Sequence, residues 1–503
     1  MDHRTEGGGG CDRERRPAKA GHGGPEQETP QRRGAGTLRR SISLVQEWAS
    51  GRPGMVVVGL LLLVKVAMTT WNAATYDLSQ YDRGLHTGRA RSGGLALEGR
   101  AYNPPLYYMP ALAFSQPEAP QADRERALLQ GLRYTNVLWL TLLYSVWIFG
   151  IIPKVFTSGS SRVLASLLLL AVPGFQKLGA MAHPDNALAG VTALAVLLVL
   201  RLWGRAGQER AGPKRFLAAL ALAALVVGLA ALTRPFGHIV CIVLWLGLMA
   251  AIVRRFGWLT KGALLNATVA TVIVGGLMAA WPGYQYAVAG RLVAVHNERY
   301  IRPFLPHRAG FDLVGYFTSF HYLDLLRQPN RWINHLSDEP SRFRNPYGNS
   351  FWTLAFSEFW GDHWLYFSGA RTGRDGKVWP KRFLFVVALP LTVFWGLALM
   401  VGLARLARDL ARRRNLRFSV LLLWGLVALG AAGYVYFLTH GGLLPGKNST
   451  VKFIYVSYLV PALAVLATPR QPSPTVFMVG SFYVLMVFAF ALPLALHWPL
   501  SWL

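Results

Sequence analysis

The stretch Gly54-Met-Val-Val-Val-Gly-Leu-Leu-Leu-Leu-Val-Lys-Val-Ala-Met-Thr-Thr-Trp71 decides the class of this protein. Spanning the hydrocarbon core of a membrane takes about 20 predominantly apolar residues, so this stretch predicts a membrane-spanning helix. No apolar core with a small-residue cleavage site precedes it, so the stretch itself would direct membrane insertion. The whole chain agrees, because it is 53% hydrophobic and only 15% charged, whereas soluble domains carry about 25% charged residues.

Residues 1–45 precede this helix and are rich in Gly, Pro, Arg and Glu. A segment with so few apolar residues cannot bury enough surface to offset the entropy of ordering, so we expect a disordered cytoplasmic tail over residues 1–50. The chain has 2 cysteines, Cys11 in this tail and Cys241 in an apolar run. A secreted scaffold held together by disulfides is therefore excluded.

Further apolar stretches follow the first one, which predicts an all-α polytopic membrane protein with about eleven transmembrane helices. The predicted spans lie near residues 54–71, 134–152, 162–178, 186–203, 216–232, 237–253, 262–285, 383–404, 417–438, 453–468 and 475–497. Residues 51–382 form the main membrane module in this prediction, including two long outer loops, 72–133 and 286–382, and residues 383–503 form the C-terminal transmembrane helices. The segment 351–367 is amphipathic and aromatic enough for a juxtamembrane helix at the interface.

The formal net charge of +28 comes mostly from loops between the spans, since residues 1–53 hold ten Lys and Arg against seven Asp and Glu. Basic residues gather in every second loop, which the positive-inside rule assigns to the cytoplasm. They are Lys154, Arg201, Arg205, Arg210, Lys214, Arg215, Arg254, Arg255, Lys261, Arg405, Arg408, Arg412, Arg413, Arg414, Arg417 and Arg470. The N-terminus is then cytoplasmic and the C-terminus outside. No nucleic-acid-binding motif collects the basic residues, and no phosphate-binding loop supports a nucleotide-powered transporter.

Polar residues in the first outer loop are the first candidates for chemistry. Asp77 and Asp82 lie within a dozen residues of the first span, and His86 follows Asp82 at helical spacing, so Asp82 and His86 share a face if the segment is helical. A carboxylate near the membrane surface suits a general base, although an Asp there can equally cap a juxtamembrane helix. The stretch Tyr102-Asn-Pro-Pro-Leu-Tyr-Tyr-Met-Pro110 suits an interfacial anchor, or structural punctuation alone.

Three further places carry polar residues where apolar ones are expected. His183 and Asp185 lie in a turn between two spans, where they either line a site or cap the next helix. Both residue types can bind a metal, but two ligands do not define a metal site. Arg234 separates two apolar runs, and it either snorkels to the interface or meets a phosphate. Lys447 and Lys452 flank the outer end of the tenth span, where a phosphate-bearing lipid would explain them.

Together these segments resemble the C-type (GT-C) membrane glycosyltransferases that use polyprenyl-phosphate-linked sugars. The subgroup that the chain is most similar to contains the protein O-mannosyltransferases and the aminoarabinose transferases. The resemblance is carried by the acidic first outer loop, by YNPPLYY at 102–108, by AHPD at 182–185 and by KFIYVSYLVP at 452–461. Trp360-Gly-Asp362 in the long loop is similar to some bacterial members. The resemblance spans roughly residues 54–470.

The resemblance implies an inverting transfer, in which a carboxylate of the first outer loop deprotonates the acceptor hydroxyl. By motif position Asp82 is the expected base and Asp77 the second choice. Arg83 follows Asp82 where the family commonly has an Asp-Glu pair, which leaves the assignment open between Asp77 and Asp82. Asp185, with His183, corresponds to the second acidic position, and Lys452 and Arg234 would neutralise the departing phosphate. His86, Tyr102, Asp362 and Lys447 complete the expected substrate-binding residues. Some relatives use a divalent metal and others do not, so metal dependence stays open.

The expected partners are a polyprenyl-phosphate-linked sugar, membrane lipids and an acceptor that is a protein, a lipid or a glycan. The resemblance favours a bacterial plasma membrane, and the outer sequon Asn448-Ser-Thr450 keeps the endoplasmic reticulum open. A transporter or flippase for a lipid-linked or anionic substrate is the alternative hypothesis, in which Arg234, Lys452 and Asp185 bind without bond cleavage. A scaffold that binds partners through its outer loops is the third hypothesis.

Overall fold

The computed structural model describes residues 51–75, 83–97, 103–208, 212–290, 313–327, 350–361, 378–412, 416–438 and 453–495, with Leu44 and Glu47. By their internal contacts the residues of the chain form two units, Met1–Val45 and Gln46–Leu503, and every described residue except Leu44 belongs to the second unit. The predicted tail over residues 1–50 therefore lies almost wholly outside the described residues.

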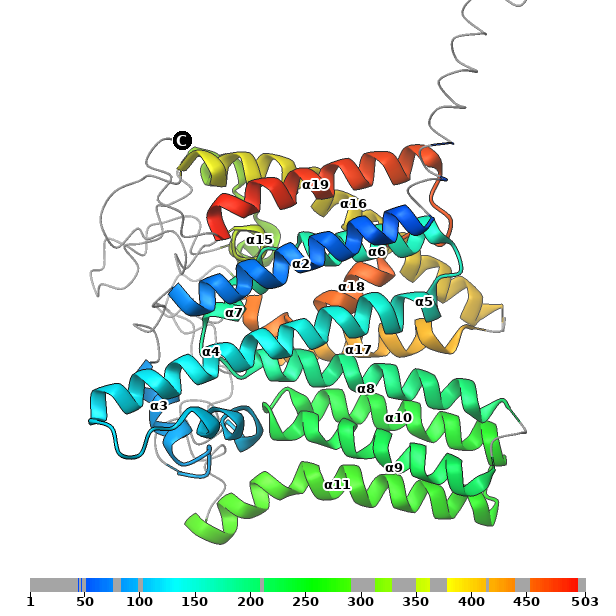
Figure 1. The fold of residues 1–503 in the computed structure, drawn as a ribbon. Coiled ribbons are helices and arrows are strands. Elements are labelled where there is room, and N and C mark those ends of the chain that lie inside the picture. Colours follow the sequence, from blue (N-terminus) through cyan, green and yellow to red (C-terminus); the bar gives the residue numbers. More distant parts are fainter. Residues whose placement is uncertain are drawn as a thin grey trace, which may run out of the picture. The chain divides into compact units, whose positions relative to one another are not determined.

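The described part of the second unit is helical throughout and contains no strand (Figure 1). Nine of its helices are long and apolar enough to cross a membrane, which confirms the prediction of an all-α, multi-pass membrane protein. They are α2 (Arg52–Thr75), α4 (Gln121–Ser145) with its continuation to Val155, α8 (Asp185–Ala206), α9 (Pro213–Leu229) with its continuation to Leu232, α10 (Gly237–Phe256), α11 (Lys261–Ala289), α16 (Val378–Ala411), α17 (Phe418–Phe437) and α19 (Pro474–Ala495).

The third and tenth predicted spans are interrupted helices rather than continuous ones. In the third, α6 (Gly159–Ala171) ends before Val172-Pro173 and α7 (Gly174–Ala180) follows. A proline has no N–H to donate and forces the preceding residue out of the helical region, so the helix breaks there. The tenth span consists of the 3₁₀ turn η10 (Phe453–Val456) and the short helix α18 (Val460–Leu466). Average hydropathy does not detect such breaks.

Lys65 of the first span lies at the break between α6 and α7. Its side chain is buried, and Nζ donates a hydrogen bond to the carbonyl oxygen of Val172 at 2.9 Å. The carbonyls in the last turn of a helix have no partner within the helix, and a cation is favourable there. Lys65 therefore completes the end of α6 and ties α2 to the segment that leads into α7.

Helix α7 approaches α2 so closely that Gly179 faces Thr69 directly. A Cβ atom added to Gly179 would lie 2.0 Å from Cγ2 of Thr69. Thr69 cannot simply rotate away, because its Oγ1 donates to the carbonyl oxygen of Lys65 at 2.8 Å. The small residue at position 179 thus sets the distance between the two helices.

Gly179→Ala is expected to destabilise the protein by about 1–3 kcal/mol, because an extra methyl group overpacks this contact. Combining it with Thr69→Ser should restore most of that loss, since serine keeps the hydroxyl and removes Cγ2. Thermal unfolding of the purified single and double variants in detergent measures both effects. Equal stability of Gly179→Ala and wild type would contradict the close packing of α2 and α7.

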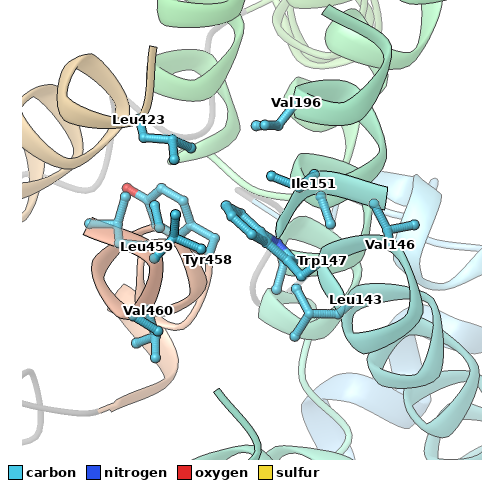
Figure 2. Packing of buried hydrophobic residues seen from close by; sticks show 14 of the residues in the cluster. Leu143, Val146, Trp147, Ile151, Val196, Leu423, Tyr458, Leu459 and Val460 are labelled. Carbon is cyan, nitrogen blue, oxygen red and sulfur yellow. The ribbon is translucent and has the colours of Figure 1, made fainter. Parts of the chain in front are cut away.

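The hydrophobic core contains a π-helical turn between α4 and α5 (Ile152–Val155), over residues Val146–Ile151. A π turn inserts one extra residue into a helix and turns the following side chains to a new direction. Trp147 from this turn is fully buried against side chains of other helices. Figure 2 shows it beside Leu143, Val146, Ile151, Val196, Leu423, Tyr458, Leu459 and Val460.

The described basic residues of the predicted cytoplasmic loops lie at one end of the helices, and the 3₁₀ turns η1, η4 and η10 lie at the other. At the second end, the turns η1 (Pro105–Tyr107) and η4 (Ala230–Leu232) contact each other, and η10 contacts both α7 and α8. We call this the site end. Four short helices and one further turn belong to the segments around it, namely α3 (Arg83–Arg91), η2 (Met109–Phe114), α13 (Leu313–Thr318), α14 (Tyr322–Arg327) and α15 (Phe351–Trp360). α15 forms within the predicted juxtamembrane segment and packs against α7, α16 and η10.

Candidate functional site

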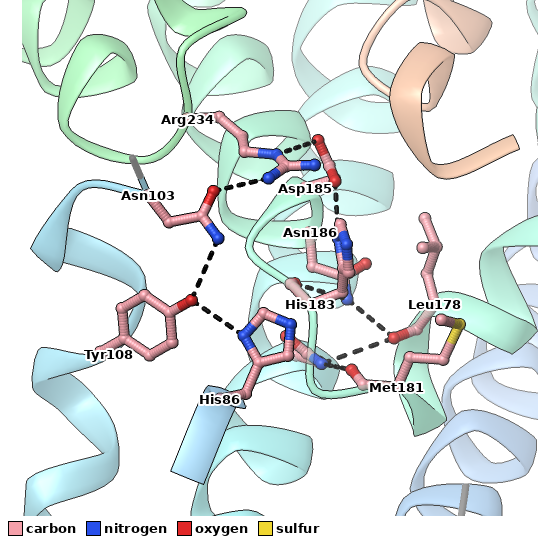
Figure 3. Close-up of polar contacts among 10 residues, drawn as sticks. His86, Asn103, Tyr108, Leu178, Met181, His183, Asp185, Asn186 and Arg234 are labelled. Carbon is pink, nitrogen blue, oxygen red and sulfur yellow. Dashed lines mark hydrogen bonds and ion pairs between the residues drawn. The ribbon is translucent and has the colours of Figure 1, made fainter. Parts of the chain in front are cut away.

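Asp185 forms two ion pairs at the site end. It is the first residue of α8 and is fully buried. Its Oδ2 lies 2.6 Å from Nδ1 of His183, and its Oδ1 lies 3.1 Å from Nε of Arg234 (Figure 3). Both carboxylate oxygens are therefore engaged by side chains rather than by the backbone N–H groups of the helix.

The contacts of Asp185 extend into a closed group of six side chains. Arg234 Nη1 donates to Asn103 Oδ1 at 2.6 Å, and Asn103 Nδ2 lies 3.4 Å from Tyr108 Oη. Tyr108 Oη lies 2.8 Å from His86 Nδ1, and the His86 and His183 rings meet edge to face with centroids 5.6 Å apart. We call His86, Asn103, Tyr108, His183, Asp185 and Arg234 the polar ring (Figure 3). None of them is more than 5% exposed.

Two buried asparagines hold the turn that carries His183 and Asp185. Asn186 Nδ2 donates to the carbonyl oxygen of Leu178 at 2.7 Å, and Asn136 Nδ2 donates to the carbonyl oxygen of Met181. The Leu178 carbonyl also accepts the backbone N–H of Met181 at 3.2 Å, and Met181 follows the end of α7. The amides from α4 and α8 therefore add side-chain donors to this turn and fix it.

Arg89 of α3 holds the other side of the polar ring. Its guanidinium group donates to the carbonyl oxygens of Gly94, Ala96 and Asn103, the last at 2.6 Å. The same group lies over the Tyr108 ring, 5.3 Å from its centroid. A planar guanidinium can bridge several acceptors at once, so Arg89 positions the backbone of Asn103 and the ring of Tyr108 together.

Arg89→Lys is expected to lower the free energy of unfolding by about 1–3 kcal/mol, because an ammonium group cannot reach all three carbonyls and leaves buried acceptors without donors. Arg91→Lys on the same helix is the matched control, since Arg91 is exposed and its ion pair within the described part of the chain is with Glu125. The control should change stability by less than about 0.5 kcal/mol. Thermal or denaturant unfolding compares the two variants, and equal losses would contradict the role of Arg89.

Among the described residues around the site, buried positive charge exceeds buried negative charge. Arg89, Arg133 and Arg234 are buried there, against Asp185 and Glu358. Guanidinium groups hold planar anions with two parallel hydrogen bonds, and a buried excess of them favours an anionic ligand. Burial raises the pKa of the neighbouring Tyr107 well above its ordinary value, and Tyr108 and Asp185 raise it further. Tyr107 is therefore a neutral phenol at physiological pH.

The structure brings four of the predicted site residues together, His86, His183, Asp185 and Arg234. It places Arg234 in a buried ion pair, so the interpretation that Arg234 only snorkels to the interface is not what the structure shows. The remaining predicted residues lie outside the described residues, namely Asp77, Asp82, Tyr102, Asp362, Lys447 and Lys452. The proposed helical face shared by Asp82 and His86 stays a prediction, since α3 is described from Arg83 onwards.

Sequence reasoning missed Asn103, Tyr108, Asn136 and Arg89 as parts of this site. The first two belong to the YNPPLYY stretch, which carried the resemblance but whose individual side chains received no role. Asn136 and Arg89 had no local signal beyond being polar residues near the predicted spans. Within the described part of the chain, no group of three or more His, Cys, Asp or Glu residues is placed to hold a metal ion. Metal dependence therefore stays open.

No protein-family model matches the chain, and no curated protein matches it either. One solved structure is similar, the crystal structure of ArnT from Cupriavidus metallidurans bound to undecaprenyl phosphate. The two chains share 15% identity at a TM-score of 0.34, over 83% of this chain and 78% of the other. The chain's own helices define its class, an integral, multi-pass, all-helical membrane protein. A buried polar ring lies at one end of those helices.

Proposed function

We propose that the protein is an inverting membrane glycosyltransferase that moves a sugar from a polyprenyl-phosphate donor to an acceptor hydroxyl. The polar ring is the observation that carries this proposal. It joins a buried arginine, a buried carboxylate and two histidines at one end of a bundle of membrane helices. Such a set can bind a phosphate and handle a proton in a water-poor site.

The donor phosphate is proposed to bind at Arg234. Asp185 orients this guanidinium through Nε, and the fork geometry of arginine matches phosphate oxygens. The ring of Tyr455 lies 5.5 Å from the Arg234 guanidinium carbon, and its centroid lies 6.5 Å from that of His183. Tyr455 follows Lys452 by three residues, which supports the proposal that Lys452 also neutralises the departing phosphate.

Asp82 is proposed as the base, with Asp77 as the second choice. His86, four residues after Asp82, is a member of the polar ring, so the first outer loop reaches the site immediately after these carboxylates. In the reaction the acceptor O–H bond breaks and its proton passes to the carboxylate. The acceptor oxygen forms a bond with the anomeric carbon, whose bond to the phosphate oxygen breaks, and polyprenyl phosphate leaves with the electron pair.

The acceptor is proposed to meet the donor at the outer face of the membrane. The basic loops lie at the end opposite to the polar ring, and the positive-inside rule assigns that end to the cytoplasm. We therefore place the N-terminus in the cytoplasm and the C-terminus outside. We place the protein preferentially in the bacterial plasma membrane, which the family resemblance favours.

The proposal is tested with purified protein in liposomes and radiolabelled sugars linked to undecaprenyl phosphate, together with crude membranes as a source of acceptor. Release of undecaprenyl phosphate, or transfer of label to the membranes, is the expected result. Intact donor that crosses the bilayer without cleavage would instead identify a flippase. No cleavage, no transfer and no movement of any donor in the panel would count against both functions.

A further inference from the structure

Asn72 is a buried side chain for which the structure offers no partner. It lies in the last turn of α2 and is 0% exposed. Within the described part of the chain, neither its Nδ2 nor its Oδ1 has a hydrogen-bond partner. A buried amide without partners is unfavourable for folding, so its presence indicates that a bound ligand supplies the missing hydrogen bonds.

The contacts between α2 and the segment 172–180 show where Asn72 lies. Lys65 contacts Val172, Met68 lies 4.0 Å from Gln176 through their Sδ and Nε2 atoms, and Thr69 faces Gly179. The two segments therefore run in the same direction towards the site end. One further turn of α2 adds 3.6 residues, which brings Asn72 to the level of the turn after Ala180 that carries His183.

Two other asparagines at this turn have unused acceptors. Asn136 Nδ2 donates to the carbonyl oxygen of Met181, and Asn186 Nδ2 donates to the carbonyl oxygen of Leu178. Their Oδ1 atoms are buried and make no hydrogen bond among the described residues, although the Tyr107 hydroxyl lies beside the Asn136 side chain. We call Asn72, Asn136 and Asn186 the carboxamide subsite. Together they offer three acceptor oxygens and one free amide donor group at the level of the turn that carries His183 and Asp185.

These unsatisfied hydrogen-bonding groups restrict the chemistry of a ligand that could bind them. A carboxylate or a phosphodiester, such as the linkage of the proposed donor, has no donor hydrogen at neutral pH, so it cannot satisfy the three amide oxygens. A hydroxyl group both donates and accepts, and two neighbouring hydroxyls of a sugar ring match the oxygen and the nitrogen of one carboxamide. The polar ring has no such surplus of acceptors, because both oxygens of Asp185 are engaged.

We propose that the carboxamide subsite binds the ring hydroxyls of the transferred sugar, with Asn72 as a specificity-determining residue. This inference rests on the proposed function and assigns its sugar pocket. Asn136 and Asn186 also hold the turn, so substituting them would mix binding with folding. Asn72 makes no bond within the described structure, and it therefore separates the two effects.

The test is Asn72→Leu, which removes both polar atoms and keeps the branched shape and the number of side-chain heavy atoms. The variant should be at least as stable as wild type in thermal unfolding, because an unsatisfied buried amide is replaced by an apolar side chain. Its kcat/KM on the sugar that wild type prefers should fall by about 10- to 100-fold, as expected for one lost hydrogen bond to a substrate hydroxyl. Asn266→Leu is the matched control, a buried asparagine on α11 whose Nδ2 donates to the carbonyl oxygen of Gly262 within its own helix.

Donor analogues that each lack one ring hydroxyl identify the contact. Removing the hydroxyl that Asn72 binds should cost wild type about as much as the substitution does, and the variant should lose nothing further on that analogue. An equal fold-loss for Asn72→Leu on every analogue, no loss at all, or a clear drop in stability would overturn the inference.

Equilibrium binding of the labelled donors separates this inference from the proposed function. Donor binding without turnover by wild type would refute the transferase. The sugar subsite would then be tested by affinity alone: Asn72→Leu should weaken binding of the intact donor more than binding of the deoxy analogue. If wild type neither binds nor turns over any undecaprenyl-phosphate-linked sugar, both proposals fail.

Discussion

Asp82→Asn is expected to lower kcat by about 10²- to 10⁴-fold and to leave donor binding within a few fold of wild type. Asparagine keeps the size of the side chain and cannot accept the proton of the acceptor hydroxyl. Donor binding rests instead on Arg234 and, in our proposal, on Lys452, neither of which changes. Single-turnover release of undecaprenyl phosphate measures kcat, and equilibrium retention of labelled donor measures binding.

Asp77→Asn is the comparison that assigns the base, and Asp123→Asn is the control for losing an exposed carboxylate. Asp123 lies in the first turn of α4, is exposed and contacts Arg126 at 3.9 Å. The control should retain the wild-type rate. A large loss in Asp77→Asn with little change in Asp82→Asn would move the base to Asp77. Full activity in both variants would contradict a base in the first outer loop, and partial transport of donor in Asp82→Asn would favour a carrier.

Asp185→Asn is expected to destabilise the protein by about 3–5 kcal/mol, because it leaves the buried guanidinium of Arg234 without its counter-charge. The substitution also removes the acceptor that orients His183, so turnover should fall below detection even in the folded fraction. Thermal unfolding in detergent measures the first effect, and transfer assays on protein selected by size-exclusion chromatography measure the second.

The double variant Asp185→Asn/Arg234→Met separates charge pairing from catalysis. Removing both charges from a buried pair is often close to neutral for stability, so more than half of the loss should be recovered. Activity should not return, because the proposed phosphate-binding group is gone. A double variant that is as unstable as Asp185→Asn alone would show that the ion pair is not the cause of the loss.

The helical framework was predictable because it depends on local properties. Apolar stretches long enough to span a membrane place nine helices without reference to any contact between them. The two interrupted spans were less accessible, although Pro173 and Pro461 mark both of them in the sequence. Hydropathy averages over a window, whereas a helix ends at a single residue that cannot continue it.

The candidate site was predictable only in part. His183 and Asp185 are neighbours in the chain, so their pairing could be expected from the turn that contains them. The partners of Arg234 are 49 and 131 residues away, at Asp185 and Asn103, and no local pattern connects them. The role of Asn72 could not be predicted either, because it rests on the lack of a hydrogen-bond partner within the described structure, which no sequence pattern records.

From the amino-acid sequence alone it follows that this chain lies in a membrane, where most of its helices begin and end, and which loops carry the positive charge. Each of these follows from the free energy of moving a local segment from water to lipid. Which polar side chains meet depends on how the helices pack. Helix packing brings α3, α4, α8 and the turn before α10 to one end, and burial there leaves His86, Asn103, Tyr108, His183, Asp185 and Arg234 to satisfy one another. In a buried site, hydrogen-bonding groups must be paired across the fold, and that pairing is a property of the whole arrangement of helices.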